Sequence, residues 1–195
     1  METILCICLG IGLSAACGFR IFVPLLALSV AAHSGHVHLA AGFQWIASNS
    51  ALIAFGTATV LEVGAYYIPW VDHALDVIAA PVAVVAGILV TASLVTDMSP
   101  LLKWTLAVIA GGGAAGLVQS GTMLIRGTSS VTTAGFGNPL VATTELAMAA
   151  VISILSLLAP VFIAVVVLLA MVWIARKFWL RSHPRISATG HPTLT

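Results

Sequence analysis

The chain has 195 residues, of which 61% are hydrophobic and 7% are charged, and its mean hydropathy is +1.15. Soluble domains carry about 25% charged residues, so this composition excludes a protein whose whole surface faces water. The formal net charge of +1 provides no basic field, which excludes nucleic acid as a partner. A membrane-spanning helix needs about 20 apolar residues. We therefore expect an all-α polytopic transmembrane bundle of about six spans, surrounded by membrane lipid.

The first expected span covers about residues 4–31. It does not resemble a cleaved signal peptide, because only Glu2 and no basic residue precedes the apolar run. Arg20 lies deep inside this span, and Pro24 follows at a position where a proline would kink a continuous helix. The sequence therefore predicts one kinked helix that holds a cation within the membrane.

A loop with three histidines follows the first span, namely His33, His36 and His38. We interpret it as a polar loop, with a metal site as the alternative, because no cysteine or carboxylate accompanies the histidines. The second span is expected at about residues 50–67 and the third at about residues 72–95. Pro69 suits the first turn of the third helix, where the missing N–H is not needed.

A turn is predicted at residues 97–100, and the fourth span should end at about Ile125. Arg126 opens a polar stretch that we expect to be a cytoplasmic loop, with an ion or phosphate pocket as the alternative, and Asn138 should cap the next helix. Residues 139–178 are long enough for two spans, with the turn between them near Ser153, Ser156 or Pro160. Residues 181–195 should form a polar cytoplasmic tail.

Basic residues concentrate after the last expected span, which predicts a cytoplasmic C-terminus. Six spans would place the N-terminus on the same side of the membrane. The expected topology therefore has both termini in the cytoplasm and the histidine loop outside.

The two halves of the chain, residues 1–97 and 98–180, echo each other, with Glu62 matched by Glu145. Both halves also carry a stripe of small residues, which lets helices approach closely. These expected helix-packing residues are Gly10, Ser14 and Gly18 in the first half and Gly112, Gly116 and Ser120 in the second. Three spans per half would make an inverted repeat, as in many transporters. We also expect the protein to form a homo-oligomer.

Ionisable residues inside apolar spans are costly, at about 2.5–3.5 kcal/mol each at the bilayer centre, and are often functional. We expect Arg20 and Glu62 to form a buried pair, with Glu145 as its echo in the second half, that serves as a substrate or proton site. The alternative is an ion pair of purely structural role that fixes the register of the helices. Asp72 and Asp76 are one helical turn apart. They suit either the first turn of a helix at the membrane–water interface, where they complement the helix dipole, or a cation bound together with Glu62. The candidate substrate- or ion-binding residues are Arg20, Glu62, Asp72, Asp76, Arg126, Asn138 and Glu145.

These features predict a transporter or channel for a small ion or polar solute, with a site near the membrane midplane where the two repeats meet. The alternative is a non-transporting scaffold that binds a partner protein and whose intramembrane charges are structural. An enzyme is not expected, because no nucleophile has a base beside it and no metal or nucleotide motif occurs. We accordingly assign no cofactor and no metal ion.

Three stretches resemble a family of small bacterial polytopic membrane proteins known only as a domain of unknown function. They are the run from Gly12 to Pro24, the run from Glu62 to Asp76, and Gly137-Asn138-Pro139 together with Glu145. The resemblance covers nearly the whole chain and implies a location in the bacterial inner membrane, with no substrate indicated. Family members often carry Asp-Lys before the proline where this chain has Tyr66 and Tyr67, so a charge relay through these positions is not expected.

Overall fold

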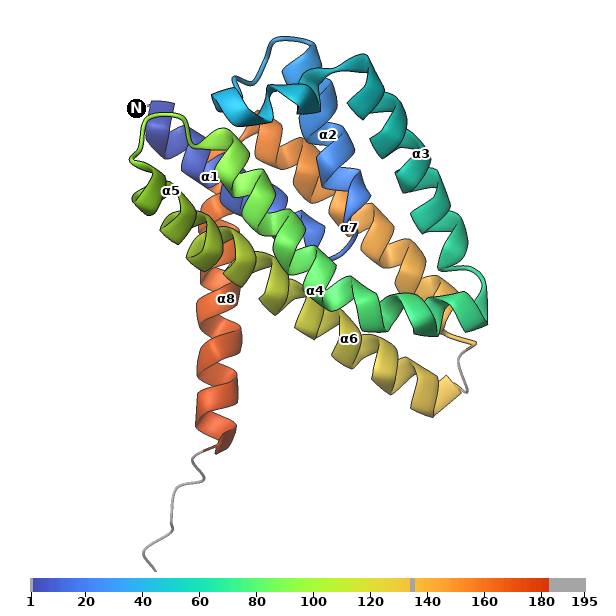
Figure 1. The fold of residues 1–195 in the computed structure, drawn as a ribbon. Helices are drawn as coiled ribbons and strands as arrows, with labels where there is room; N and C mark the ends of the chain where they lie inside the picture. The colour runs from blue at the N-terminus through green and yellow to red at the C-terminus, as the bar shows by residue number, and fades with distance from the viewer. Residues whose placement is uncertain (1, 134–135, 183–195) are drawn as a thin grey trace, which may run out of the picture.

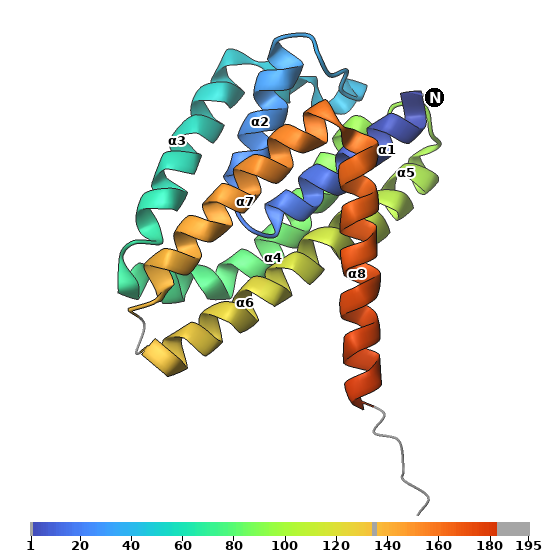
Figure 2. The same cartoon turned by 180° about the vertical axis from the view of Figure 1, so that it is seen from behind.

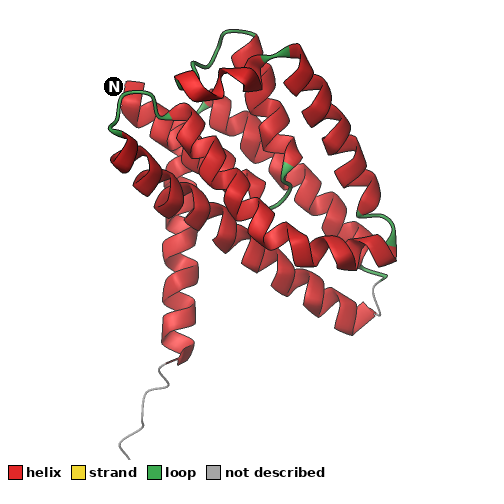
Figure 3. Cartoon of the chain, in the orientation of Figure 1, coloured by secondary structure: helices red, strands yellow, loops and turns green. Residues whose placement is uncertain are grey.

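The computed structural model describes the backbone of residues 2–133 and 136–182, and the side chains of these residues except at positions 69, 70, 72–74, 76, 175 and 178–182. Every regular element in these two ranges is helical, as Figure 3 shows, which confirms the all-α prediction. The elements are α1 (Glu2–Cys17), α2 (Phe22–His33), η1 (Ala41–Ala47), α3 (Asn49–Ala65), α4 (Pro69–Leu94), α5 (Pro100–Leu106), η2 (Ala107–Gly112), α6 (Gly113–Thr133), α7 (Asn138–Leu158) and α8 (Pro160–Ser182).

The first expected span is a hairpin of two short helices instead of one kinked helix. α1 ends at Cys17, the chain turns at residues 18–21, and α2 then runs back against α1 (Figure 1). The Arg20 N–H donates to the Ala16 carbonyl at 3.1 Å and so closes the end of α1. Pro24 lies in the first turn of α2, where backbone N–H groups have no intrahelical partner. The proline therefore helps to start a new helix and does not bend an existing one.

Both outer ends of the hairpin lie at the same end of the molecule, which we call the N-terminal end. Glu2 at the start of α1 and His36 just after α2 line one pocket with Thr96, which follows α4, and Pro160, which begins α8. Figures 1 and 2 show α3, the run from α5 to α6, and α8 leading away from this end, while α4 and α7 return to it. The tip of the hairpin lies within the body of the bundle.

α1 packs closely against α4 through the first predicted stripe of small residues. The Ser14 hydroxyl donates to the Gly87 carbonyl at 2.7 Å and lies 2.9 Å from the Thr91 hydroxyl. A methyl group placed on Gly18 would lie 2.5 Å from the Ala115 carbonyl oxygen of α6. The first stripe therefore lies where α1 and the turn after it come close to α4 and α6.

The second stripe comes close to a neighbouring helix at two of its three positions. A methyl group on Gly112 would lie 3.0 Å from Ile88 of α4, and one on Gly116 would lie 3.2 Å from Val84 of the same helix. Ser120 is exposed, and its hydroxyl donates to the Gly116 carbonyl of its own helix. The prediction for Ser120 is therefore wrong, because the helix face that meets α4 does not extend to this residue.

Several helix boundaries agree with the sequence. Ser48 caps α3 by accepting the Ala51 N–H at 3.2 Å, Pro69 opens α4, and the break between the last two helices falls at Pro160. The expected loop after Arg126 is different, because α6 continues to Thr133. The hydroxyls of Thr128, Thr132 and Thr133 donate to backbone carbonyls one turn earlier, so these polar side chains are accommodated within the helix.

Within the residues that the structure describes, three helical stretches are long and apolar enough to cross a membrane: Val77–Leu94, Pro100–Thr133 and Asn138–Leu158. The bent pair of η1 and α3, with an angle of 65°, makes a fourth if it is one span. α1, α2 and the part of α8 from Pro160 to Ile174 are apolar but shorter. Several helices therefore suit a membrane, as expected, although this count does not reach the six predicted spans.

Helix directions agree with inversion for only part of the sequence repeat. Glu62 and Glu145 lie on α3 and α7, which run in opposite directions, as an inverted repeat requires. The two small-residue stripes lie on α1 and on the run from η2 to α6, and both of these segments run antiparallel to α4. These two segments are therefore parallel to each other, whereas an inverted repeat would make them antiparallel. The difference arises because the chain reverses direction after α1 and has no matching reversal in the second half.

Candidate functional site

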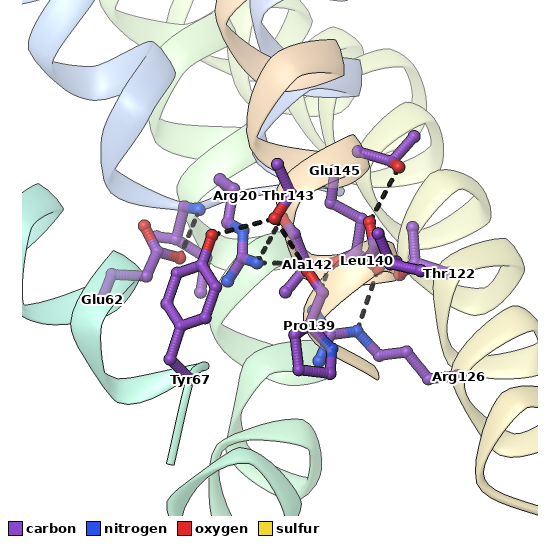
Figure 4. Close-up of polar contacts among 12 residues, drawn as sticks. Arg20, Glu62, Tyr67, Thr122, Arg126, Pro139, Leu140, Ala142, Thr143 and Glu145 are labelled. Atoms are coloured by element: carbon purple, nitrogen blue, oxygen red, sulfur yellow. Dashed lines mark hydrogen bonds and ion pairs between the residues drawn. The ribbon is translucent and has the colours of Figure 1, made fainter. Parts of the chain in front are cut away.

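Arg20 lies at the tip of the hairpin and is only 2% exposed. Its Nη2 donates to the Ala142 carbonyl of α7 at 2.9 Å and lies 3.5 Å from Glu145 Oε2 (Figure 4). Its guanidinium carbon stands 3.7 Å from the centre of the Tyr66 ring. Among the described residues, its Nε and Nη1 have no hydrogen-bond partner. Buried polar groups are nearly always paired, so these two nitrogens mark a place where an acceptor is missing.

The Glu62 carboxylate accepts hydrogen bonds from backbone N–H groups and does not form the expected ion pair with Arg20. Its Oε1 accepts the Ile21 N–H at 2.8 Å, and its Oε2 accepts the Phe22 N–H at 3.0 Å. The carboxylate of α3 therefore caps the start of α2, where Ile21 offers no capping side chain. Negative charge is also favoured at this position by the helix dipole. The predicted pair of Arg20 with Glu62 is replaced by an ion pair of Arg20 with Glu145.

Arg126 and Glu145 form the main ion pair of a buried cluster, which consists of these two residues together with Arg20, Glu62 and Tyr66. Arg126 Nε donates to Glu145 Oε1 at 2.9 Å, and its Nη2 donates to Oε2, so the contact is bidentate and joins α6 to α7. The two residues are 4% and 5% exposed, and the Arg126 guanidinium carbon also lies 4.3 Å from the centre of the Tyr66 ring. Arg126 was expected in a cytoplasmic loop. It is buried because α6 extends through it and turns it toward α7.

Tyr66 is the member of the cluster that sequence reasoning missed. It is 7% exposed and lies against two guanidinium groups, which bind favourably to aromatic faces. Its neighbour Tyr67 has its hydroxyl 2.9 Å from the Thr143 hydroxyl and so connects α3 with α7. Tyrosines at the end of an apolar span are typical of a membrane interface, so their place in the sequence does not indicate that Tyr66 contacts the buried arginines.

Asn138 does not cap α7 as predicted. It is the first residue of that helix, the cap position belongs to Gly137, and no side chain caps it. The Asn138 amide instead donates to the Ser130 hydroxyl of α6 at 3.2 Å. Asn138 therefore helps to hold α6 against α7 near the ion pair.

The remaining candidates lie apart from the cluster or outside the description. Asp72 and Asp76 belong to α4, but their side chains lie outside the described residues. His33 Nδ1 lies 2.8 Å from the Ala47 carbonyl, and His36 Nδ1 lies 2.9 Å from the Ser34 hydroxyl. In the described part of the chain, no three histidines, cysteines or carboxylates are grouped to hold a metal ion.

Two cavities approach the cluster from different sides. A largely apolar cavity of about 460 Å³ reaches the start of α2 and Glu62, and its wall includes Ile21, Phe22 and Tyr66. A smaller cavity of about 240 Å³ reaches Glu145. The cluster thus combines a positively charged group with unused donors, two carboxylates and access from both sides. Chemically, this arrangement can hold a small charged or polar solute.

Comparison with known proteins gives a family and no closer relative. Neither the curated proteins nor the solved structures contain a match to this chain. The model of one family, described as "Domain of unknown function (DUF4126)", matches residues 7–179 and so includes every residue of the cluster. The chain therefore belongs to the DUF4126 family, in agreement with the resemblance noted in its sequence.

Proposed function

We propose that this protein is a membrane transporter or channel for a small ion or polar solute. The observation that carries the proposal is the buried Arg20, whose Nε and Nη1 lack partners among the described residues. A buried cation with unused donors is costly for stability, and it is expected where a solute or water completes the site. Intramembrane ionisable residues are functional by default.

The depth of Arg20 supports this proposal. α1 has 16 residues, and at about 1.5 Å per residue it extends ~24 Å. The hydrocarbon layer is about 30 Å thick, so the tip of the hairpin would lie well inside it. Non-helical backbone at such depth is tolerated only where protein or water covers it. Helices interrupted near the midplane form the binding sites of many transporters.

The proposal includes a specific topology. We place the hairpin of α1 and α2 as a re-entrant segment that enters and leaves the membrane on one side. Five segments then cross: α3, α4, the run from α5 to α6, α7, and α8. The basic residues after α8 favour a cytoplasmic C-terminus in a bacterial inner membrane. The odd number of crossings puts the N-terminus outside, in place of the cytoplasmic N-terminus that six spans imply.

An inverted repeat remains part of the proposal in a reduced form. α3 and α7 run in opposite directions, both pack on α2, and each brings a glutamate to the hairpin tip. Sites at the interface of inverted repeats are typical of secondary transporters. A homo-oligomer would use other faces of the protein, because the small-residue stripes, apart from the exposed Ser120, are covered within one chain.

A scaffold without transport is the second candidate, and the bidentate pair of Arg126 with Glu145 favours it. This pair fixes α6 against α7 and suits a purely structural role. The two candidates differ in their expectation for Arg20. A scaffold needs Arg20 only for folding, whereas a transporter needs it for flux.

The test is solute flux into liposomes that contain the purified protein. A panel of small cations, small anions and neutral polar solutes should include at least one that crosses faster than in protein-free liposomes. Arg20→Gln should reduce that flux to the protein-free rate, while Asp97→Asn, at an exposed loop position, should leave it unchanged. Folded protein that moves none of these solutes would contradict the proposal, as would an unchanged flux in Arg20→Gln.

A further inference from the structure

We infer that the hairpin tip is a site for a small monovalent anion and that the Glu62 carboxylate occupies this site as a tethered competitor. The inference rests on the proposed function, since it names the class of solute that the same site takes. Three independent observations support it: the backbone donors at the start of α2, the unused nitrogens of the adjacent Arg20, and the cavity that reaches Ile21, Phe22 and Glu62.

The first observation is the pair of backbone donors that the Glu62 carboxylate occupies. The N–H groups of Ile21 and Phe22 point at one carboxylate, at 2.8 and 3.0 Å. Such a pair of donors at the start of a helix binds anions in general, because the helix dipole adds to the hydrogen bonds. The group held there is an anion that belongs to the protein itself. When the α3 side chain moves away, the same donors are free for an anion from solution.

The second observation is the positive charge beside these donors. Arg20 directly precedes Ile21 and is 2% exposed, with Nε and Nη1 unpaired among the described residues. Its ion partner Glu145 lies 3.5 Å away and is already held by both the Nε and the Nη2 of Arg126. The charge of Arg20 is therefore only partly balanced by that carboxylate. A guanidinium in a low-dielectric environment stabilises a nearby anion strongly.

The third observation is access. The cavity of about 460 Å³ is lined by Ile21, Phe22 and Glu62, so it ends at the proposed donors. Most of its remaining wall is aliphatic, formed by Leu61, Leu75, Ile78, Ala79 and Val82 among others. An anion must lose water to pass such a wall, and this loss is most costly for multiply charged anions. The expected order therefore places thiocyanate, nitrate and chloride ahead of sulfate and phosphate.

The binding test uses the purified full-length protein with thiocyanate, nitrate, chloride and sulfate as sodium salts at constant ionic strength, with gluconate as the replacement. Binding is measured as a saturable rise in the melting temperature and, for chloride, by equilibrium dialysis of the radiolabelled ion. Glu62→Gln should bind chloride and nitrate at least about tenfold more tightly than the wild type, because removing an occupant that fills a site most of the time restores its intrinsic affinity. Gln keeps an amide oxygen for one backbone N–H and so limits the damage to folding.

Two control variants separate site binding from general salt effects. Asp97→Asn removes an exposed carboxylate in a loop and should bind anions as the wild type does. Adding Arg20→Lys to Glu62→Gln keeps the positive charge but removes Nε and Nη1, and it should weaken the gain. Equal affinity in Glu62→Gln and the wild type would overturn the competitor role. Preference for sulfate would overturn the proposed class of anion.

The same variants in liposomes distinguish this inference from the proposed function. Saturable monovalent anion binding without flux of any solute would support the site and reject transport. Flux of a cation or a neutral solute, with no anion binding in Glu62→Gln, would support transport and reject the anion site. Flux of chloride and nitrate that rises in Glu62→Gln would support both.

Discussion

At the scale of single residues, the structure decides which charges share a partner. Glu145 receives the bidentate contact of Arg126 and a longer contact from Arg20. Glu62 gives both of its oxygens to backbone N–H groups. The two glutamates match in sequence but differ in chemistry, because one balances side-chain charge and the other replaces a helix cap.

This difference predicts the outcome of two double-mutant cycles. Arg126→Gln or Glu145→Gln alone should each lower the free energy of unfolding by about 3–5 kcal/mol, since each leaves a buried charge without its main partner. The double variant should recover part of the loss, which gives a large coupling energy. The measurement is reversible unfolding of the purified protein in detergent.

The comparison cycle uses Arg20→Gln and Glu62→Gln. These residues have different hydrogen-bond partners in the structure, so only the through-space attraction between their charges couples them, and their coupling energy should be clearly smaller than in the first cycle. A larger coupling for this second cycle than for the first would contradict the assignment of Glu145 as the shared partner.

At the scale of helices, close packing includes the faces where α1, α4 and α6 meet. Gly18 lies against the backbone of α6, and Gly116 lies against the side chain of Val84 in α4. Gly121 and Gly127 are also in α6, but a methyl group there would meet nothing within 4 Å. The same residue type therefore has opposite roles on two faces of one helix.

Alanine substitutions should separate these roles. Gly18→Ala should lower the free energy of unfolding by about 1–3 kcal/mol, because its methyl group meets a carbonyl oxygen that cannot easily move. Gly116→Ala should cost less, since the neighbouring valine side chain can adjust. The measurement is again unfolding in detergent.

Gly121→Ala and Gly127→Ala are the matched controls. Each should leave stability unchanged or raise it by about 0.5–1 kcal/mol, because alanine favours a helix more than glycine does. Equal losses at all four positions would show that helix contacts do not explain the effect.

At the scale of the whole molecule, one reversal of the chain changes the topology. The turn at residues 18–21 returns α2 to the N-terminal end, where Glu2, His36 and Pro160 line a common pocket. α8 begins at that end and leads away from it, as Figures 1 and 2 show. The start of the chain and the end of α8 therefore lie at opposite ends of the protein.

Site-directed labelling in intact cells tests this arrangement. A cysteine introduced at Glu2 or at His36, in a variant without the native cysteines, should react with a membrane-impermeant maleimide added outside. A cysteine introduced at the exposed Lys177 should react only after the membrane is opened. Protection at both Glu2 and Lys177, with reaction at His36, would restore the six-span model and remove the re-entrant hairpin.

The sequence alone was enough to predict the class of the protein and many helix boundaries. An apolar composition indicates a lipid environment directly, and Pro69 and Pro160 act on the few backbone groups next to them. The family resemblance is likewise carried by local motifs and is confirmed over residues 7–179. The small residues of α1 also indicated close helix packing, but they did not identify the partner helix.

The tertiary structure alone decided the hairpin, the partners of the charges and the burial of Arg126 and Tyr66. The energetic cost of a buried charge indicates that the charge has a partner. Which residue is that partner depends on distances between helices that are far apart in sequence. A proline likewise lacks a backbone N–H in either case, so the sequence does not decide whether it bends one helix or begins another. For Pro24 the choice was settled by a carboxylate from α3, 38 residues along the chain at Glu62, which caps the new helix and so stabilises the break.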